Sequence, residues 1–147
     1  MEEYVKLAKK LNLPSFEEMN SYFQIADIED KNILHEVVKK IHDQTTHFTN
    51  MLEEIINPEH LRSLNEAGMF SEEDKKIILR LYRKLQHTNR QKDLLEVEFE
   101  EEAYINFINN SFNEYKLIKD DLKGIIKKLR DCWNKNKNTK LELGYFG

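Results

Sequence analysis

The strongest structural signal in this chain comes from residues 104–133, whose sequence is YINFINNSFNEYKLIKDDLKGIIKKLRDCW. Nine residues within it follow one another at alternating steps of four and three, and eight of the nine are apolar or aromatic. This heptad spacing predicts a long amphipathic α-helix. Flanking apolar residues widen its packing face, which favours the core of a multi-helix bundle over a two-stranded zipper. The row consists of Tyr104, Ile108, Ser111, Tyr115, Ile118, Leu122, Ile125, Leu129 and Cys132.

Two other long helices are predicted at residues 30–56 and 72–92, and the C-terminal helix is expected to cover residues 100–137. Short amphipathic helices are expected before and between them. Several polar or helix-breaking residues mark the expected boundaries, because they satisfy free backbone groups at helix ends or stop the helix. They are Ser15 with Glu18 as a capping box, Asp27 or Asp30 before the first long helix, Asn57 and Pro58 at the start of a short helix, Gly68 as its left-handed end, and Ser71 at the start of the next helix.

These elements predict an all-α protein, a helical bundle of four to six helices with a long C-terminal helix. We expect a single helical-bundle domain over residues 1–138 and a C-terminal tail over residues 139–147, since 147 residues can bury one sizeable core. Residues 86–93 contain no apolar side chain, so helix and loop both remain open there. The alternating residues 95–100 and 141–145 leave a short two-stranded element as an alternative.

Charge is distributed unevenly along the chain, although the net charge is only −4. Residues 1–74 carry 16 acids and 7 bases, a balance of −9, whereas residues 75–147 carry 11 acids and 16 bases, a balance of +5. This asymmetry indicates either packing between oppositely charged surfaces or an anionic partner for the second half. The single cysteine and the polar start predict a cytoplasmic protein, and no apolar run is long enough to span a membrane.

Metal, cofactor and nucleophile chemistry find little support in the sequence. Five histidines are present, but none has Glu or Asp three residues before it, as a ferritin-like carboxylate site requires. Cys132 lies in the apolar row and is expected to be a buried small hydrophobe rather than a reactive thiol. We therefore predict no metal site, no cofactor and no catalytic residue.

Basic residues form the one arrangement that suggests ligand binding. Residues 75–92 contain seven Lys or Arg and no acid. At helical spacing they make a cationic row, which is the arrangement that grips a phosphate backbone, although a solvated helix face has the same appearance. A second row recurs every seven residues on the C-terminal helix. The first row is Lys76, Arg80, Arg83, His87 and Arg90 with Lys84 beside it, and the second is Lys116, Lys123, Arg130 and Lys137.

Arg80 and His87, with six residues between them, resemble the Arg-x4–6-His signature of HEPN-type helical RNases and nucleotide-binding domains. The resemblance covers these two residues. The polar residue that usually follows the arginine is Leu81 here. The resemblance implies an RNase or a nucleotide-binding domain.

The preferred interpretation is a non-enzymatic interaction protein that forms a homo-oligomer or binds a protein partner. It rests on the 15 aromatic residues and on helical faces wide enough for more than one neighbour. The apolar tail is a second expected contact, packed either on its own bundle or on a partner. The alternative is a nucleic-acid-binding module that uses the basic rows. The tail residues concerned are Leu141, Leu143, Tyr145 and Phe146.

Overall fold

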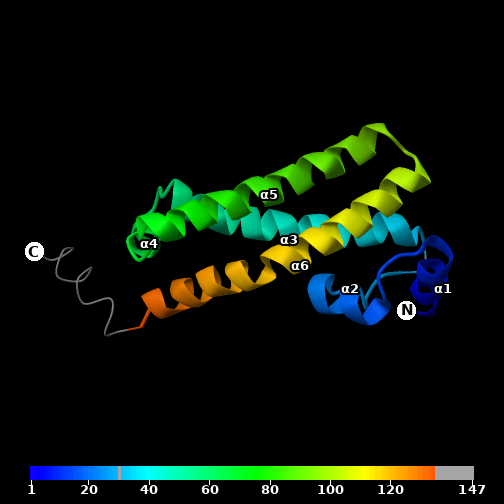
Figure 1. Ribbon diagram of the computed structural model, residues 1–147, viewed down its shortest axis with the longest axis horizontal. Coiled ribbons are helices and arrows are strands. Elements are labelled where there is room, and N and C mark those ends of the chain that lie inside the picture. Colours follow the sequence, from blue (N-terminus) through cyan, green and yellow to red (C-terminus); the bar gives the residue numbers. More distant parts are fainter. Residues whose placement is uncertain (30, 135–147) are drawn as a thin grey trace, which may run out of the picture. The chain divides into compact units, whose positions relative to one another are not determined.

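A computed structural model describes residues 1–29 and 31–134, and it confirms the all-α class (Figure 1). The described residues are 80% helical and form six helices and no strand. No helix in these ranges is both long enough and apolar enough to cross a bilayer. The helices are α1 (Glu2–Leu11), α2 (Phe16–Phe23), α3 (Ile33–Ile56), α4 (Leu61–Ala67), α5 (Glu72–Val97) and α6 (Glu101–Cys132).

The chain divides into two compact units. Unit 1 comprises residues 1–48 and 84–117, and unit 2 comprises residues 49–83 and 118–147, of which the structure describes the part up to residue 134. Each of the three long helices contributes one part to each unit. The apolar row of α6 therefore supplies core residues to both units, and seven of its nine members are buried, with Tyr104 and Tyr115 half-buried.

The core of unit 1 forms where α1 and α2 pack against parts of the long helices. Met19, Val37, Ile41 and Ile108 are fully buried in it. Tyr4 is buried as well, and its hydroxyl donates a hydrogen bond to the carbonyl oxygen of Pro14 at 2.7 Å. Four aromatic rings extend this core in tilted, stacked and edge-on contacts with centroids 5.0–6.2 Å apart, a favourable geometry for ring pairs. They are Tyr22, Phe23, Phe112 and Tyr115.

The core of unit 2 draws on α3, α5 and α6, and α4 is joined to it by polar contacts. Its buried aliphatic residues lie at helical spacing on each long helix, as the heptad pattern predicts. Two ion pairs connect α5 with α6, between Arg80 and Asp121 and between Lys128 and Asp74. The buried residues of this core are Leu52, Ile55, Ile78, Leu81, Ile118, Leu122, Ile125 and Leu129, with Phe70 from the connection after α4.

Helix α5 continues to Val97 through the segment that contains no apolar residue. Of residues 86–93, Asn89 alone is buried, and its Nδ2 donates to Oε1 of Gln86 at 2.9 Å while its Oδ1 has no partner. The helical alternative for these residues is confirmed. Residues 95–97 are helical too, so the strand alternative is wrong there, and residues 141–145 lie outside the described residues.

Two of the expected helix starts are confirmed. Ser15 Oγ accepts a hydrogen bond from the backbone N–H of Glu18 at 3.2 Å, and Ser71 Oγ accepts from the backbone N–H of Asp74 at 3.1 Å. The capping box is not fully reciprocal, because the Glu18 carboxylate accepts from the Ser15 hydroxyl and not from its backbone N–H. Asp27 instead pairs with Lys40, and Asp30 lies outside the described residues.

The expected ends of the short helix α4 need two corrections. The helix does not start at Pro58: its first residue is Leu61 and His60 is its N-cap, so Asn57 and Pro58 belong to the connection. Gly68 has φ −67°, which any residue can adopt, and is not the left-handed stop that was expected. Among residues 1–29 and 31–134, Asn12, Gln24 and Asn32 have positive φ angles, and the first two end α1 and α2.

A matched pair of leucine substitutions on α6 tests this packing. Leu122 is 2% exposed and Leu117 is 74% exposed. We expect Leu122→Ala to lower the free energy of unfolding by about 2–5 kcal/mol, because it removes buried contacts and leaves a cavity. Leu117→Ala should change it by no more than about 0.5 kcal/mol. Urea unfolding followed by circular dichroism measures both values, and equal losses would contradict this assignment of the buried face.

Candidate partner-binding surfaces

The predicted basic row lies on α5, and its side chains are exposed to solvent or half-buried. Lys76, Arg80, Arg83, His87 and Arg90 are exposed, and Lys84 is half-buried. The row extends over the middle of one continuous helix, because residues 86–93 are helical. Seven-residue and three- or four-residue steps place these cations on one side of α5.

Acidic neighbours neutralise half of this row. Arg80 pairs with Asp121, Lys84 Nζ lies 2.8 Å from Oε1 of Glu114, and Arg90 lies 2.7 Å from Asp93. Lys76, Arg83 and His87 have no ion pair with any described residue. Because a phosphate would have to compete with three carboxylates, the row attracts anions less strongly than its sequence indicates.

The second basic row is exposed along α6, where the structure describes it. Lys116, Lys123 and Arg130 are all exposed, and Arg130 Nε lies 3.0 Å from the Asp131 carboxylate. Lys137 lies outside the described residues. The predicted partner contact of the tail, formed by Leu141, Leu143, Tyr145 and Phe146, lies outside them as well.

The structure contains no cluster of three or more His, Cys, Asp or Glu within residues 1–29 and 31–134 that could hold a metal ion. Cys132 is buried as expected, and Asn65 Nδ2 donates a hydrogen bond to its Sγ at 3.2 Å. Burial, and secondarily the nearby Glu66 carboxylate, raises the pKa of the Cys132 thiol. A thiol with a raised pKa is a poor nucleophile at neutral pH.

Helix α5 carries both residues of the HEPN-like signature, and both side chains are exposed. The guanidinium of Arg80 pairs with the Asp121 carboxylate, with which a substrate phosphate would have to compete. His87 has no ion pair with a described residue. The geometry places neither of them in the wall of the hollow described below.

An exposed apolar cluster at the turn between α5 and α6 was missed by the sequence interpretation. We call it the turn cluster: Leu94, Val97 and Phe99. Val97 is 77% exposed and Phe99 is 79% exposed. The backbone N–H of Glu98 donates to the carbonyl of Leu94, and that of Glu100 to the carbonyl of Glu98, both at 2.9 Å. The alternating sequence here left a short strand as an alternative, whereas in the structure Val97 and Phe99 are exposed in a segment where Glu96, Glu98 and Glu100 are exposed as well.

A second exposed apolar surface lies on and around α4 in unit 2. We call it the α4 surface: Ile56, Leu61, Leu64 and Met69. Leu61 is 53% exposed and Leu64 is 55% exposed, and they are three residues apart on one side of the helix. The sequence interpretation missed this feature, because the exposure of Leu61 and Leu64 depends on which side of α4 the rest of the unit covers.

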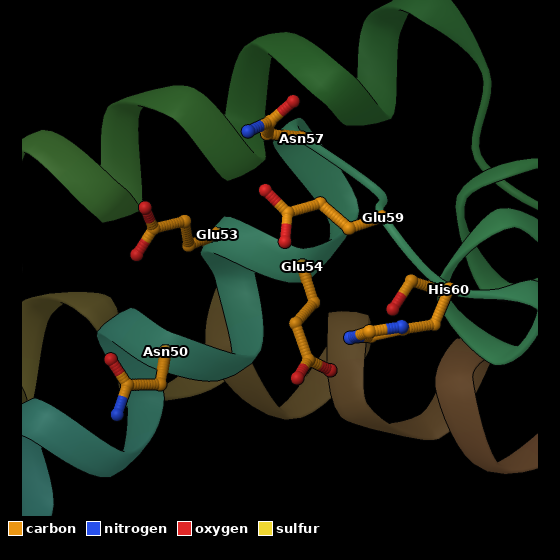
Figure 2. Close-up of a pocket in the computed structure, with 7 residues that line it drawn as sticks. Asn50, Glu53, Glu54, Asn57, Glu59 and His60 are labelled. Atoms are coloured by element: carbon orange, nitrogen blue, oxygen red, sulfur yellow. The ribbon is translucent and has the colours of Figure 1, made fainter.

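An acidic hollow of about 310 Å³ adjoins α4 in the same unit (Figure 2). Figure 2 shows Glu53 and Glu54 on the last turns of α3, and Glu59 and His60 on the connection to α4. Arg62 pairs with Glu54 at 3.0 Å, while Glu53 and Glu59 have no ion pair with a described residue. The lining residues are Asn50, Glu53, Glu54, Asn57, Glu59, His60 and Ser63.

The hollow brings together Ser63, His60 and Glu54, the residue types of a nucleophile, a base and an orienting acid. Ser63 is buried, and its Oγ has no hydrogen-bond partner among the described residues. Nucleophile activation needs the serine within hydrogen-bond reach of the base. The three residues are therefore not assembled as a hydrolytic triad, and the hollow is better described by its negative charge.

Comparisons of the chain with protein-family models, with curated proteins and with solved structures gave no match.

The ion pair between Lys128 and Asp74 predicts a pH-dependent contribution to stability. The hydrogen bond from Lys128 Nζ, at 2.7 Å, lowers the pKa of Asp74 below its ordinary value of 3.8. A lowered folded-state pKa stabilises the folded protein above 3.8, and this stabilisation is lost as the pH falls through the folded-state value. The Tm difference between the unmodified protein and Asp74→Asn should therefore be largest near neutral pH and vanish in strong acid.

Asp120→Asn provides the control for that titration, because Asp120 is exposed and has no ion pair with a described residue. Thermal unfolding at a series of pH values measures both differences. A Tm difference for Asp74→Asn that grows on acidification would contradict the ion pair.

Proposed function

We propose that this chain is a non-enzymatic helical-bundle interaction protein that binds a protein partner, with a second copy of itself as the first candidate. The observation that carries the proposal is the turn cluster, where Val97 and Phe99 are more than three-quarters exposed. Isolated exposed apolar residues are ordinary, but here Val97 and Phe99 lie within five positions of half-exposed Leu94 at one turn.

The energy available at the turn cluster is substantial for so few residues. Burying a Val or Phe side chain contributes about 1.5–3 kcal/mol, so Val97 and Phe99 together supply about 3–6 kcal/mol. A micromolar complex needs about 8 kcal/mol, and part of the gross gain is lost in ordering. Further contacts around the cluster must supply the remainder.

Carboxylates surround the turn cluster and define the chemistry of the partner. Glu98 and Glu100 through Glu102 are exposed and have no ion pair with a described residue, whereas exposed Glu96 pairs with Lys92. A partner surface that covers the apolar residues and carries Lys or Arg at its rim complements this arrangement. A second copy offers such cations in Lys76 and Arg83, which are exposed and have no ion pair with a described residue. Charge complementarity therefore supports self-association.

Sedimentation of the full chain tests the proposal. We expect a species of twice the monomer mass of 17.7 kDa, and we expect it to dissociate in the double variant Val97→Asp with Phe99→Asp. Both side chains are exposed, so the double variant should retain its helical circular dichroism spectrum. Leu117→Asp, which adds a charge at another exposed position, should leave the assembly intact. A monomer at all concentrations would exclude self-association.

Nucleic-acid binding is the second candidate, supported by the exposed Lys76 and Arg83 on α5. The acids paired with Arg80, Lys84 and Arg90 oppose it. We expect affinity for RNA or DNA no tighter than about micromolar at physiological salt, the range of non-specific binding.

Filter binding at several salt concentrations, with Arg83→Ala beside the unmodified protein, measures this affinity. A salt-sensitive nanomolar complex, lost when Arg80, Arg83 and Arg90 are all replaced by Ala, would reverse the ranking of the two candidates. RNA cleavage abolished by His87→Ala would favour the HEPN-like alternative.

A further inference from the structure

We propose that the acidic hollow beside α4 binds a small aliphatic amine that carries two or more ammonium groups. The residues that line the hollow lie between positions 50 and 63, and all of them belong to unit 2. The proposal is independent of self-association through the turn cluster, because that cluster belongs to unit 1. Three observations carry it: carboxylates without cations, a buried hydroxyl without a partner, and a wall of polar side chains.

Two of the three carboxylates at the hollow are not neutralised by the described part of the chain. Arg62 Nη2 lies 3.0 Å from the Glu54 carboxylate, whereas Glu53 and Glu59 have no ion pair with a described residue. Figure 2 shows the Glu59 side chain extending from the connection back toward α3, on which Glu53 and Glu54 lie. A ligand with two positive charges complements the two carboxylates that remain.

A buried hydroxyl at the wall of the hollow is the second observation. Ser63 is 1% exposed and lines the hollow, and no described residue forms a hydrogen bond with its Oγ. It follows the N-cap residue His60 by three positions, and His60 lines the hollow too. Buried hydroxyls in proteins nearly always have a hydrogen-bond partner. An ammonium group bound in the hollow would donate the hydrogen bond that Ser63 Oγ can accept.

The arrangement of the lining groups favours an organic cation over a metal ion. Within residues 1–29 and 31–134, no three His, Cys, Asp or Glu side chains are placed together so that they could hold a metal ion. Quaternary ammonium groups are typically bound by aromatic faces, and the described residues that line the hollow include no Phe, Tyr or Trp. They do include Asn50 and Asn57, whose amide oxygens accept hydrogen bonds. Primary ammonium groups, each with three N–H donors, suit these acceptors.

The volume of the hollow limits the size of the ligand. At about 30 Å³ for each water molecule, 310 Å³ corresponds to about ten non-hydrogen atoms. A linear diamine or triamine has this size, and its ammonium groups are separated by several bonds, so they can reach separate carboxylates. A lysine side chain of another protein has one ammonium group and would leave one carboxylate unpaired. The charge and the volume together therefore favour a free diamine or triamine.

Isothermal titration calorimetry of the full chain with putrescine, a linear diamine, tests the proposal. We expect saturable binding with a submillimolar dissociation constant at low salt, because two charge-assisted contacts form together. Butylamine has the same carbon chain and one ammonium group, so it should bind at least about tenfold more weakly. No saturable heat with putrescine in the millimolar range would overturn the proposal, and so would equal affinities for the two amines.

Magnesium chloride separates a binding site from a diffuse attraction of counter-ions. Mg²⁺ carries the same charge as putrescine but cannot donate hydrogen bonds. We expect the triamine spermidine to displace putrescine at a lower concentration than Mg²⁺ does, at matched ionic strength. Equal displacement by Mg²⁺ and spermidine would mean that charge alone attracts the amine, and the proposal would fail.

Two double variants locate the bound amine. Glu53→Gln with Glu59→Gln should weaken putrescine binding at least about tenfold, because both unpaired carboxylates are lost. Glu73→Gln with Asp120→Asn is the matched control, since it removes two exposed acids of unit 2 that have no ion pair with a described residue and do not line the hollow. The control should change the affinity by no more than about twofold. Equal losses in the two variants would contradict binding at the hollow.

Ser63→Ala tests the contribution of the buried hydroxyl. We expect it to weaken putrescine binding by about threefold to tenfold, because an ammonium group loses one acceptor. Since Ser63 Oγ has no hydrogen bond to a described residue, the variant should keep the Tm of the unmodified protein or raise it slightly. Thermal unfolding without ligand measures that Tm. An unchanged affinity in folded Ser63→Ala would show that the hydroxyl does not contact the amine and would overturn the site as described.

Discussion

Burial of one apolar row along α6 is the constraint that links the two units. Ile108 lies in the core of unit 1, and Leu122 in that of unit 2, at full burial or close to it. Because both belong to one continuous helix, the heptad spacing of α6 must suit two sets of neighbours simultaneously. Substitutions that alter this spacing would consequently disturb both cores, whereas changes in α1 or α4 affect the unit to which each belongs.

Ion pairs between neighbouring helices account for part of the charge pattern of the sequence. Acids of α6 neutralise cations of α5 within each unit, as the pairs Arg80–Asp121 and Lys84–Glu114 show. Many cations of the second half of the sequence therefore have carboxylate partners within the same fold. At the hollow, Glu53 and Glu59 have no ion pair with a described residue, whereas Glu54 pairs with Arg62, and Glu96 beside the turn cluster pairs with Lys92.

The sequence was informative where periodicity was strong and ambiguous where helices depend on their neighbours. The α6 row and the starts at Ser15 and Ser71 were predictable because side-chain spacing and capping act locally. Residues 86–93 gave no periodic signal, since their helix is continued by packing on either side rather than by their own apolar groups. The exposed state of Val97 and Phe99 depends on tertiary placement, which alternation of residue types does not encode.

Asn89 in the buried row of α5 has a consequence for how the helices align. It occupies a place between Leu85 and Leu95 where the neighbouring buried positions are apolar, and its Oδ1 has no partner. Sliding α5 by one turn would move this amide into the position of Leu85 and bury more polar surface against hydrocarbon. A single polar side chain of this kind selects one longitudinal alignment among several that hydrophobic burial alone would tolerate, and it does so at some expense of stability.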